Sequence, residues 1–181
     1  EGDRIRIGAR TYFTQNDPWR LEFYNAYGFK DQQYKYGVEG RYMFNRVNRF
    51  MIGGGTKRDI TQLGVQLTTE DGILSRSFAS STVFARGENA SLSSVIQTSF
   101  FTSIEPWKNF QVRVDGTLQS IKSANPEDFN LMYTLNGNLR RTANDSHVTI
   151  SLIARPGAKF SQTGVDRYEH STLAPTIVLK Y

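Results

Sequence analysis

The sequence contains no cysteine, three methionines and five prolines among its 181 residues. The absence of cysteine excludes a disulfide framework and thiolate metal sites. Only two histidines are present and they lie far apart in the sequence, so we expect no metal and no other cofactor. No apolar run approaches the roughly 18 residues that a membrane-spanning helix requires. No signal peptide precedes the first strand-like pattern, so we expect the chain to be a piece of a longer polypeptide.

What the sequence has instead is alternation of apolar and charged residues. In the segment RIRIGARTYF (4–13), arginines stand between apolar or uncharged residues at every second position. Similar patterns recur along the chain and helical periodicity is almost absent, which predicts an all-β antiparallel protein. The predicted strands span residues 4–13, 19–30, 34–44, 49–57, 91–105, 110–121, 130–141, 147–155 and 172–181.

The connections between these strands alternate in length. Short turns built from Asn, Asp and Pro are predicted at 14–18, 45–48, 105–109 and 142–146. Long connections, which we assign to external loops, span 58–90, 122–129 and 156–171. Only residues 31–33 are short where a long loop is expected. Long strands with tight turns at one end and long loops at the other are typical of an outer-membrane β-barrel.

The two faces of the predicted strands differ in charge. One face is apolar, with Arg141 as its only charged residue, and the other carries most of the charged residues. A soluble sandwich or lipocalin-like barrel would turn the apolar face inward, whereas an outer-membrane barrel would turn it toward lipid. Strand length, loop asymmetry and aromatic residues near the strand ends favour the membrane barrel. The predicted aromatic girdle consists of Phe13, Trp19, Phe44, Phe50, Trp107, Phe110 and Tyr181.

The opposite, charged face is then predicted to line the lumen of the barrel. Its first four strands carry a basic wall that comprises Arg4, Arg6, Arg10, Arg20, Lys35, Arg41 and Arg49. One interpretation is a lumen that attracts anions or a dock for an acidic plug. The other is a set of Arg–Glu ladders that only stabilise the barrel, and we favour this second interpretation.

Catalytic constellations are poor. Asp145, Ser146 and His147 are triad residue types, but neighbours on one strand point to opposite faces. The segment YEHST (168–172) loosely resembles the His–Ser neighbourhood of the outer-membrane phospholipase without its Asn-Gly signature, so lipid hydrolysis is a remote alternative. The glycines of IGGGTK (52–57) lack phosphate-loop spacing and predict a strand bend or bulge. No nucleic-acid-binding signature occurs, despite a net charge of +5.

Several motifs, taken in order, resemble a family of Bacteroidota outer-membrane proteins in which an N-terminal carboxypeptidase-regulatory-like domain precedes a β-barrel of unknown function. The segments that carry the resemblance are residues 1–11, 20–37 and 57–64, followed by SIEPWKNF, ARPGAKF and LAPTIVLKY. Ala9 and Asn25 depart from the family pattern. The resemblance implies a middle portion of the barrel, with further strands supplied from outside this chain. The family has no established activity, so no site residues are carried over.

The sequence therefore predicts a non-enzymatic protein of the bacterial outer membrane that serves as a subunit of an assembly, export or uptake complex. Its expected partners are outer-membrane lipids and other outer-membrane proteins, and not nucleic acid. The alternative is a stand-alone channel or transporter with an anion-leaning basic lumen.

Overall fold

The computed structural model describes residues 4–29, 32–62, 92–127, 129–170 and 173–181. Within these ranges the regular structure consists of antiparallel strands, which confirms the all-β prediction. The same ranges contain no helix of the length and hydrophobicity needed to cross a membrane.

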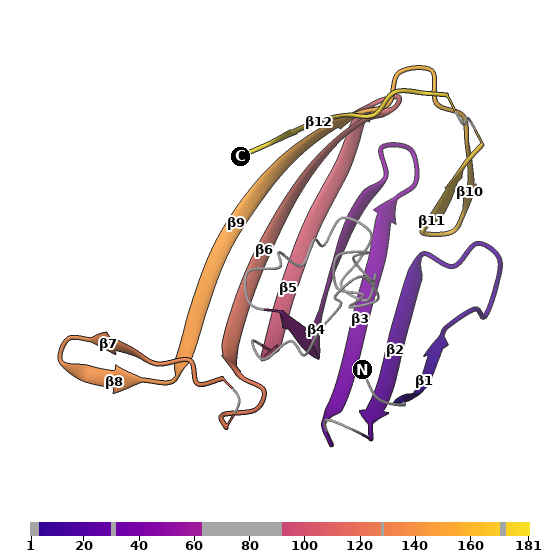
Figure 1. Cartoon of the computed structure of the whole chain (residues 1–181). Coiled ribbons are helices and arrows are strands. Elements are labelled where there is room, and N and C mark those ends of the chain that lie inside the picture. The colour runs from indigo at the N-terminus through magenta and orange to yellow at the C-terminus, as the bar shows by residue number, and fades with distance from the viewer. Residues whose placement is uncertain (1–3, 30–31, 63–91, 128, 171–172) are drawn as a thin grey trace.

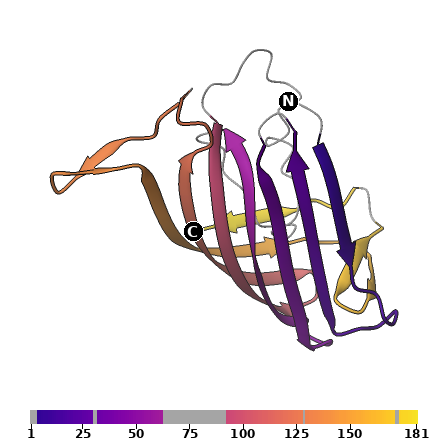
Figure 2. The same cartoon turned by 90° about the horizontal axis from the view of Figure 1, so that it is seen from below.

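Eight strands form one curved sheet that is open at both edges (Figures 1 and 2). In sheet order they are β1 (Arg4–Arg10), β2 (Trp19–Gly28), β3 (Tyr34–Asn45), β4 (Phe50–Gln62), β5 (Leu92–Trp107), β6 (Phe110–Ser123), β9 (Thr142–Ala154) and β12 (Ile177–Lys180). Each strand pairs with the next in antiparallel register. The sheet therefore follows the chain as a meander, and β1 and β12 are its edge strands.

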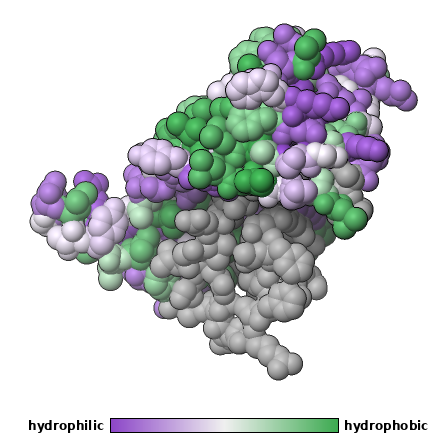
Figure 3. Space-filling view, turned by 90° about the horizontal axis from the view of Figure 1, so that it is seen from above, coloured by the Kyte–Doolittle hydropathy of each residue, from purple (hydrophilic) through white to green (hydrophobic). Residues whose placement is uncertain are grey.

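The side chains alternate between two faces of this sheet, which we call the inner and the outer face. The outer face is apolar and exposed: Ile7, Phe100 and Val148 are 73%, 59% and 65% exposed. The inner face is polar and largely buried, and Arg20 and Gln97 on it are 1% and 0% exposed. A water-soluble sheet normally shows the opposite distribution, with its apolar face covered. Figure 3 shows apolar side chains gathered into a continuous area of surface beside a hydrophilic region.

Glycines in the middle of the sheet allow aromatic rings to lie flat on it. A Cβ at Gly116 would stand 2.2 Å from the ring of Phe100, and one at Gly53 would stand 2.6 Å from the ring of Phe101. The sequence predicts a strand bend or a bulge at residues 52–57, and the bulge is wrong because the glycines of β4 pair with β5 in unbroken register. The register of β4 shifts only on its β3 side, between Met43 and Asn45.

The predicted strand 130–141 is wrong as a member of the sheet. It is a separate hairpin of β7 (Tyr133–Leu135) and β8 (Asn138–Arg140) that projects away from the sheet (Figure 1). Its two-residue turn is Asn136–Gly137, with φ angles of 51° and 77°, a combination that strongly favours a hairpin. The predicted turn 142–146 is also wrong. These residues begin β9 and pair with β6.

Because residues 130–141 do not cross the sheet, the last long connection lies at the opposite end of the sheet from the predicted one. Ala154, at the end of β9, pairs with Phe110, so the described residues 156–170 leave the sheet where the short turns 14–18, 45–48 and 105–109 lie. The prediction that this connection lies at the opposite end, among the long loops, is therefore wrong. It contains a second hairpin, β10 (Phe160–Thr163) and β11 (Asp166–Glu169), which folds back onto the inner face.

The other strand boundaries differ from the prediction by up to five residues, and of the predicted strand 172–181 the structure describes only Ile177–Lys180 as a strand. The largest extension is that of β4, which continues to Gln62. This places Arg58 in outer-face register near the strand end, where its Nη2 donates a hydrogen bond to Gln33 Oε1 at 2.9 Å. Arg141 lies between β8 and β9, outside the sheet. Residues 63–90 of the predicted loop 58–90 lie outside the described residues.

Candidate functional site

The residues of the predicted basic wall lie on the inner face of the sheet or beside it. Arg10, Arg20, Lys35 and Arg41 are in inner-face register, and Arg49 immediately precedes β4. The guanidinium of Arg6 lies 4.0 Å from the ring centroid of Tyr24, on the same face. The structure gives the backbone of Arg4 but does not describe its side chain. The described side chains of this set therefore lie on one face of the sheet or beside it.

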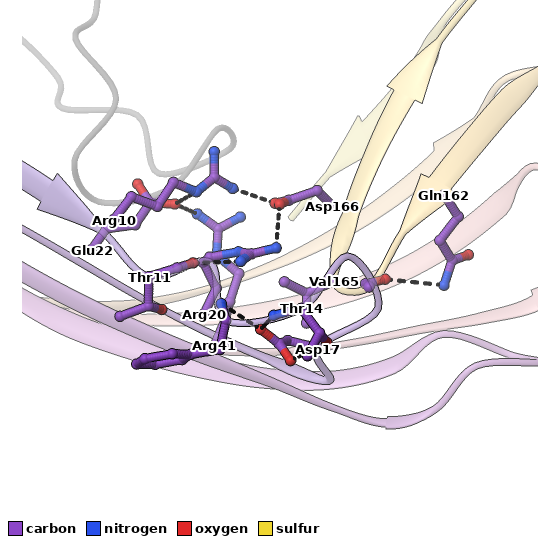
Figure 4. A network of polar contacts seen from close by, with 12 residues as sticks. Arg10, Thr11, Thr14, Asp17, Arg20, Glu22, Arg41, Gln162, Val165 and Asp166 are labelled. Carbon is purple, nitrogen blue, oxygen red and sulfur yellow. Dashed lines mark hydrogen bonds and ion pairs between the residues drawn. The ribbon is translucent and has the colours of Figure 1, made fainter.

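An acidic side chain from the β10–β11 hairpin occupies the centre of this basic group (Figure 4). Asp166 Oδ2 accepts a hydrogen bond from Arg20 Nη2 at 2.9 Å, and Asp166 Oδ1 pairs with Arg10 Nη2. Arg20 also donates to the carbonyl of Thr11, and its side chain is fully buried. One carboxylate is thus held by two guanidinium groups from adjacent strands, which is a strong form of charge-assisted hydrogen bonding.

A ladder of ion pairs continues from this point across β1, β2 and β3. Glu22 Oε1 lies 3.0 Å from Arg10 Nε and 2.8 Å from Arg41 Nη2. Arg41 Nη2 also lies 3.6 Å from Glu39 Oε1. The acidic side chains alternate with the basic ones in space, so much of the positive charge of this wall is compensated within the protein.

The tip of the hairpin fits closely against the turn between β1 and β2. Gly164 has a φ of +58°, and a Cβ at this position would lie 2.3 Å from the carbonyl oxygen of Asp17. Only glycine meets both conditions without strain. The next residue, Val165, is 3% exposed and packs in a small apolar cluster with Met43, Met51 and Phe101.

A second group of contacts holds the hairpin on its other side. Arg49 Nη2 donates to the carbonyl of Val165 at 3.2 Å, and Arg167 Nη1 pairs with Glu105 Oε2 at 2.5 Å. Burial is the main cause that lowers the pKa of Arg49. Arg167 also stacks on Phe160, with 3.7 Å between the guanidinium carbon and the ring centroid. We refer to Arg10, Arg20, Arg49 and Glu105, with the hairpin tip they hold, as the ionic dock.

The turn at residues 14–18 supports the dock through Asp17. Its Oδ2 accepts hydrogen bonds from the amides of Phe13 and Thr14 at 3.0 and 2.8 Å, and its Oδ1 accepts one from Thr14 Oγ1 at 2.6 Å. The hydrogen bond from the Thr14 hydroxyl is the largest of the causes that hold the pKa of Asp17 below its ordinary value. The ionised carboxylate therefore fixes the turn against which Gly164 packs.

Several buried polar atoms of the inner face make no hydrogen bond to any residue that the structure describes. They include Nε of Arg20, Nη1 of Arg49, both amide atoms of Gln97 and the hydroxyls of Ser93 and Ser103. Buried polar groups are usually satisfied by protein or by ordered water. The inner face is therefore suited to contact with water or with polar ligands rather than to dry packing.

Six of the seven residues of the predicted aromatic girdle lie on the outer side of the sheet at the end with the short turns. Their rings form pairs beside three turns: Phe13 with Trp19, Phe44 with Phe50, and Trp107 with Phe110, at centroid separations of 5.5, 5.5 and 5.4 Å. Tyr181 follows β12 and is exposed. It lies away from that end, because its partner Ile150 is four residues before Ala154. A second aromatic group lies at the other end of β2 and β3, where Tyr27 contacts Phe29 and Tyr34.

The catalytic candidates do not form a catalytic arrangement in the described residues. His147 Nδ1 and Asp145 Oδ2 are 2.9 Å apart on one side of β9, and Ser146 points to the other side. Ser171, the expected partner of His170, lies outside the described residues. In the part of the chain that the structure describes, no group of three His, Asp or Glu side chains is arranged to hold a metal ion.

Sequence reasoning missed the acidic half of the dock. Asp166 and Arg167 lie in a segment that was predicted only as a loop, and Glu105 was placed at the end of a strand without a role. The signal that could have found the hairpin is Gly164–Val165, a Gly-X pair between two short polar segments, which is typical of a two-residue hairpin turn.

Comparison of the chain with protein-family models, curated proteins and solved structures finds no match. The faces of the sheet and the ionic dock are therefore the basis for assigning a function to the chain.

Proposed function

We propose that the chain forms part of the wall of a bacterial outer-membrane β-barrel, and that this barrel is a non-enzymatic subunit of an assembly, export or uptake complex. One observation carries the proposal: the sheet exposes its apolar face and covers its charged face. An exposed apolar face is stable in contact with lipid, and a charged face is stable against a water-filled or plugged lumen.

The exposed outer face extends across the whole sheet, from Ile7 on β1 to Leu179 on β12. Contiguous exposed apolar patches larger than a few hundred Å² are rare on monomeric soluble proteins and mark contact with a partner or a membrane. In lipid, this face requires no covering protein layer, because hydrocarbon is as apolar as the side chains themselves.

The aromatic pairs support the same placement. Tyr and Trp side chains are enriched where a membrane protein crosses the boundary between hydrocarbon and water. Here they lie at both ends of β2 and β3, with apolar residues such as Phe23 between them. Arg58 is close to a strand end, where a long basic side chain can reach the interface.

The two edge strands support a barrel that continues beyond the sheet. An unpaired edge inside a membrane would leave backbone N–H and C=O groups without partners, at a cost of several kcal/mol for each group. In the proposed barrel, further strands of the full-length protein pair with β1 and β12.

The charge pairing of the inner face supports a subunit rather than an anion-selective channel. Four side chains of the basic wall, Arg10, Arg20, Arg41 and Arg49, are paired with Glu22, Asp166, Glu39 and Glu105. The hairpin also covers part of the inner face at one end of the sheet. A wall of paired charges suits a scaffold with a closed interior.

The proposal is tested by extracting the full-length protein from native membranes with a mild detergent and identifying what remains bound after size-exclusion chromatography. We expect the protein in the outer-membrane fraction, with a defined set of partners at fixed ratio. Recovery in the soluble fraction would contradict the membrane placement, and a lone monodisperse species would contradict the subunit role.

A further inference from the structure

The β10–β11 hairpin is attached to the sheet by its side chains and not by a strand ladder. The two strands pair only with each other, as a two-stranded sheet of their own. No backbone ladder of the eight-stranded sheet would therefore break if the hairpin left the inner face.

Most of the contacts that hold the hairpin are ionic, and Gln162 Nε2 and Tyr168 add hydrogen bonds to Met43 Sδ and to Tyr12. Asp166 pairs with Arg10 and Arg20, Arg167 pairs with Glu105, and the carbonyl of Val165 accepts one hydrogen bond. Val165 is the member of the hairpin in the apolar cluster under the tip. The apolar contribution to docking is therefore small compared with that of a packed core.

The net free energy that these ionic contacts contribute to docking is also small. The attraction within a buried ion pair is largely offset by the loss of hydration of both charges. In the docked state Arg20 Nε and Arg49 Nη1 are buried without a hydrogen bond to the described part of the chain, and water could satisfy both once the hairpin leaves. The docked and released states are thus expected to lie close in free energy.

We propose that the β10–β11 hairpin is a releasable plug, which covers the inner face at the end with the short turns and opens it when Asp166 leaves Arg10 and Arg20. Release exposes two guanidinium groups that are positioned to bind another carboxylate. The hairpin connects β9 to β12 but binds β1, β2 and β5. Release therefore also breaks the side-chain contacts between the β9–β12 connection and these three strands. This inference goes beyond the proposed function and does not depend on it.

The test uses the absence of cysteine in the chain. Val165→Cys places a thiol at a position that is 3% exposed in the docked hairpin, and Ser161→Cys places one at an exposed position of the same hairpin. Each is made in the full-length protein, with any cysteine elsewhere replaced. The rate of reaction with a water-soluble maleimide is then measured in detergent.

We expect the thiol at position 165 to react at least about 10-fold more slowly than the thiol at 161, because a protected site reacts only when it opens. Asp166→Asn should raise the rate at 165 by about 10-fold or more, since one of the two paired charges is removed. Glu127→Gln, which removes a carboxylate at an exposed position beyond the far end of β6, is the control, and it should leave the rate unchanged.

Arg10→Gln provides a second route to release without altering the hairpin, should D166N fail to fold. Equal rates at position 165 in the parent, D166N and R10Q proteins would show that the ion pairs do not control release of the hairpin, and would overturn the proposal. A parent in which the thiols at 165 and 161 react equally fast would overturn it as well, because the hairpin would not be docked. Both readings are made in detergent solution, so they do not depend on the membrane placement or on any partner.

Discussion

Arg20 and Asp166 are 146 residues apart in the sequence and form a buried ion pair, with 2.9 Å between Nη2 and Oδ2. Arg20 is fixed in the sheet by its bond to the carbonyl of Thr11, whereas Asp166 belongs to a hairpin outside the sheet. The pair therefore joins the second strand of the sheet to a connection between its last two strands.

Removing one partner of this pair should destabilise the protein. Arg20→Met leaves the buried Asp166 with Arg10 alone and frees the carbonyl of Thr11, so we expect a loss of about 2–4 kcal/mol in the free energy of unfolding. Unfolding of the full-length protein in urea, followed by tryptophan fluorescence, measures it. Lys108→Met at an exposed turn position is the control and should change stability by less than about 0.5 kcal/mol.

The double variant Arg20→Met with Asp166→Asn separates this pair from its surroundings. Because both charges are gone, its loss of stability should be smaller than the sum of the two single losses. Strictly additive losses would mean that the two side chains do not interact.

Two glycines with positive φ offer a matched test of the hairpin tip. Gly137→Ala, at φ +77° with open space around it, should cost about 1–2 kcal/mol for the left-handed backbone alone. Gly164→Ala carries the same backbone cost and also places a methyl group 2.3 Å from the carbonyl oxygen of Asp17. We therefore expect G164A to expose the hairpin to limited proteolysis and G137A to leave it protected. Equal cleavage in both variants would contradict the close fit.

The outer face should reject charge. Val148 is 65% exposed in the middle of this face, and Val47 is 95% exposed in a turn. In lipid vesicles Val148→Arg should cost about 2–4 kcal/mol of folding free energy, while Val47→Arg should cost less than about 0.5 kcal/mol. If both substitutions are equally harmless in vesicles, the outer face does not contact hydrocarbon.

The turn at Asp17 should respond to acid. Its pKa is lowered by the hydrogen bonds it accepts, so the ionised carboxylate stabilises the folded protein at neutral pH. This stabilisation is lost as the pH falls below the ordinary value of 3.8 and through the lowered folded-state pKa. The difference in melting temperature between the parent and Asp17→Asn should therefore be present at pH 7 and shrink in strong acid. A difference that is independent of pH would exclude the carboxylate as its cause.

The alternation of residues predicted most strands of the sheet and the composition of both faces, but not the β7–β8 hairpin or the start of β9. β2 begins at Trp19 as predicted, and β3 begins at Tyr34. A period of two determines which side chains share a face, so it placed the basic residues together before their contacts were known. A period of two does not indicate where a strand reverses. The pattern therefore predicts one strand over residues 130–141, although the chain turns at Asn136–Gly137.

Only the basic residues of the ionic dock could be predicted from the sequence. Arg10 and Arg20 belong to strands with clear alternation, whereas their partner Asp166 lies in a short hairpin without a long periodic pattern. The contact depends on how a connection folds back over the sheet. That path is decided by the fit of Gly164 and Val165 against distant residues, and no local sequence signal encodes a fit of this kind.

The orientation of the outer face is tested most directly in proteoliposomes that contain the full-length protein and brominated lipids. Single cysteines at the outer positions 118 and 148 and at the inner positions 117 and 147 are labelled in turn with an environment-sensitive fluorophore. We expect bromine quenching at Leu118→Cys and Val148→Cys and none at Thr117→Cys and His147→Cys, because successive residues of a strand face opposite sides. Equal quenching on both faces, or none on either, would contradict a sheet whose apolar face lies in the membrane.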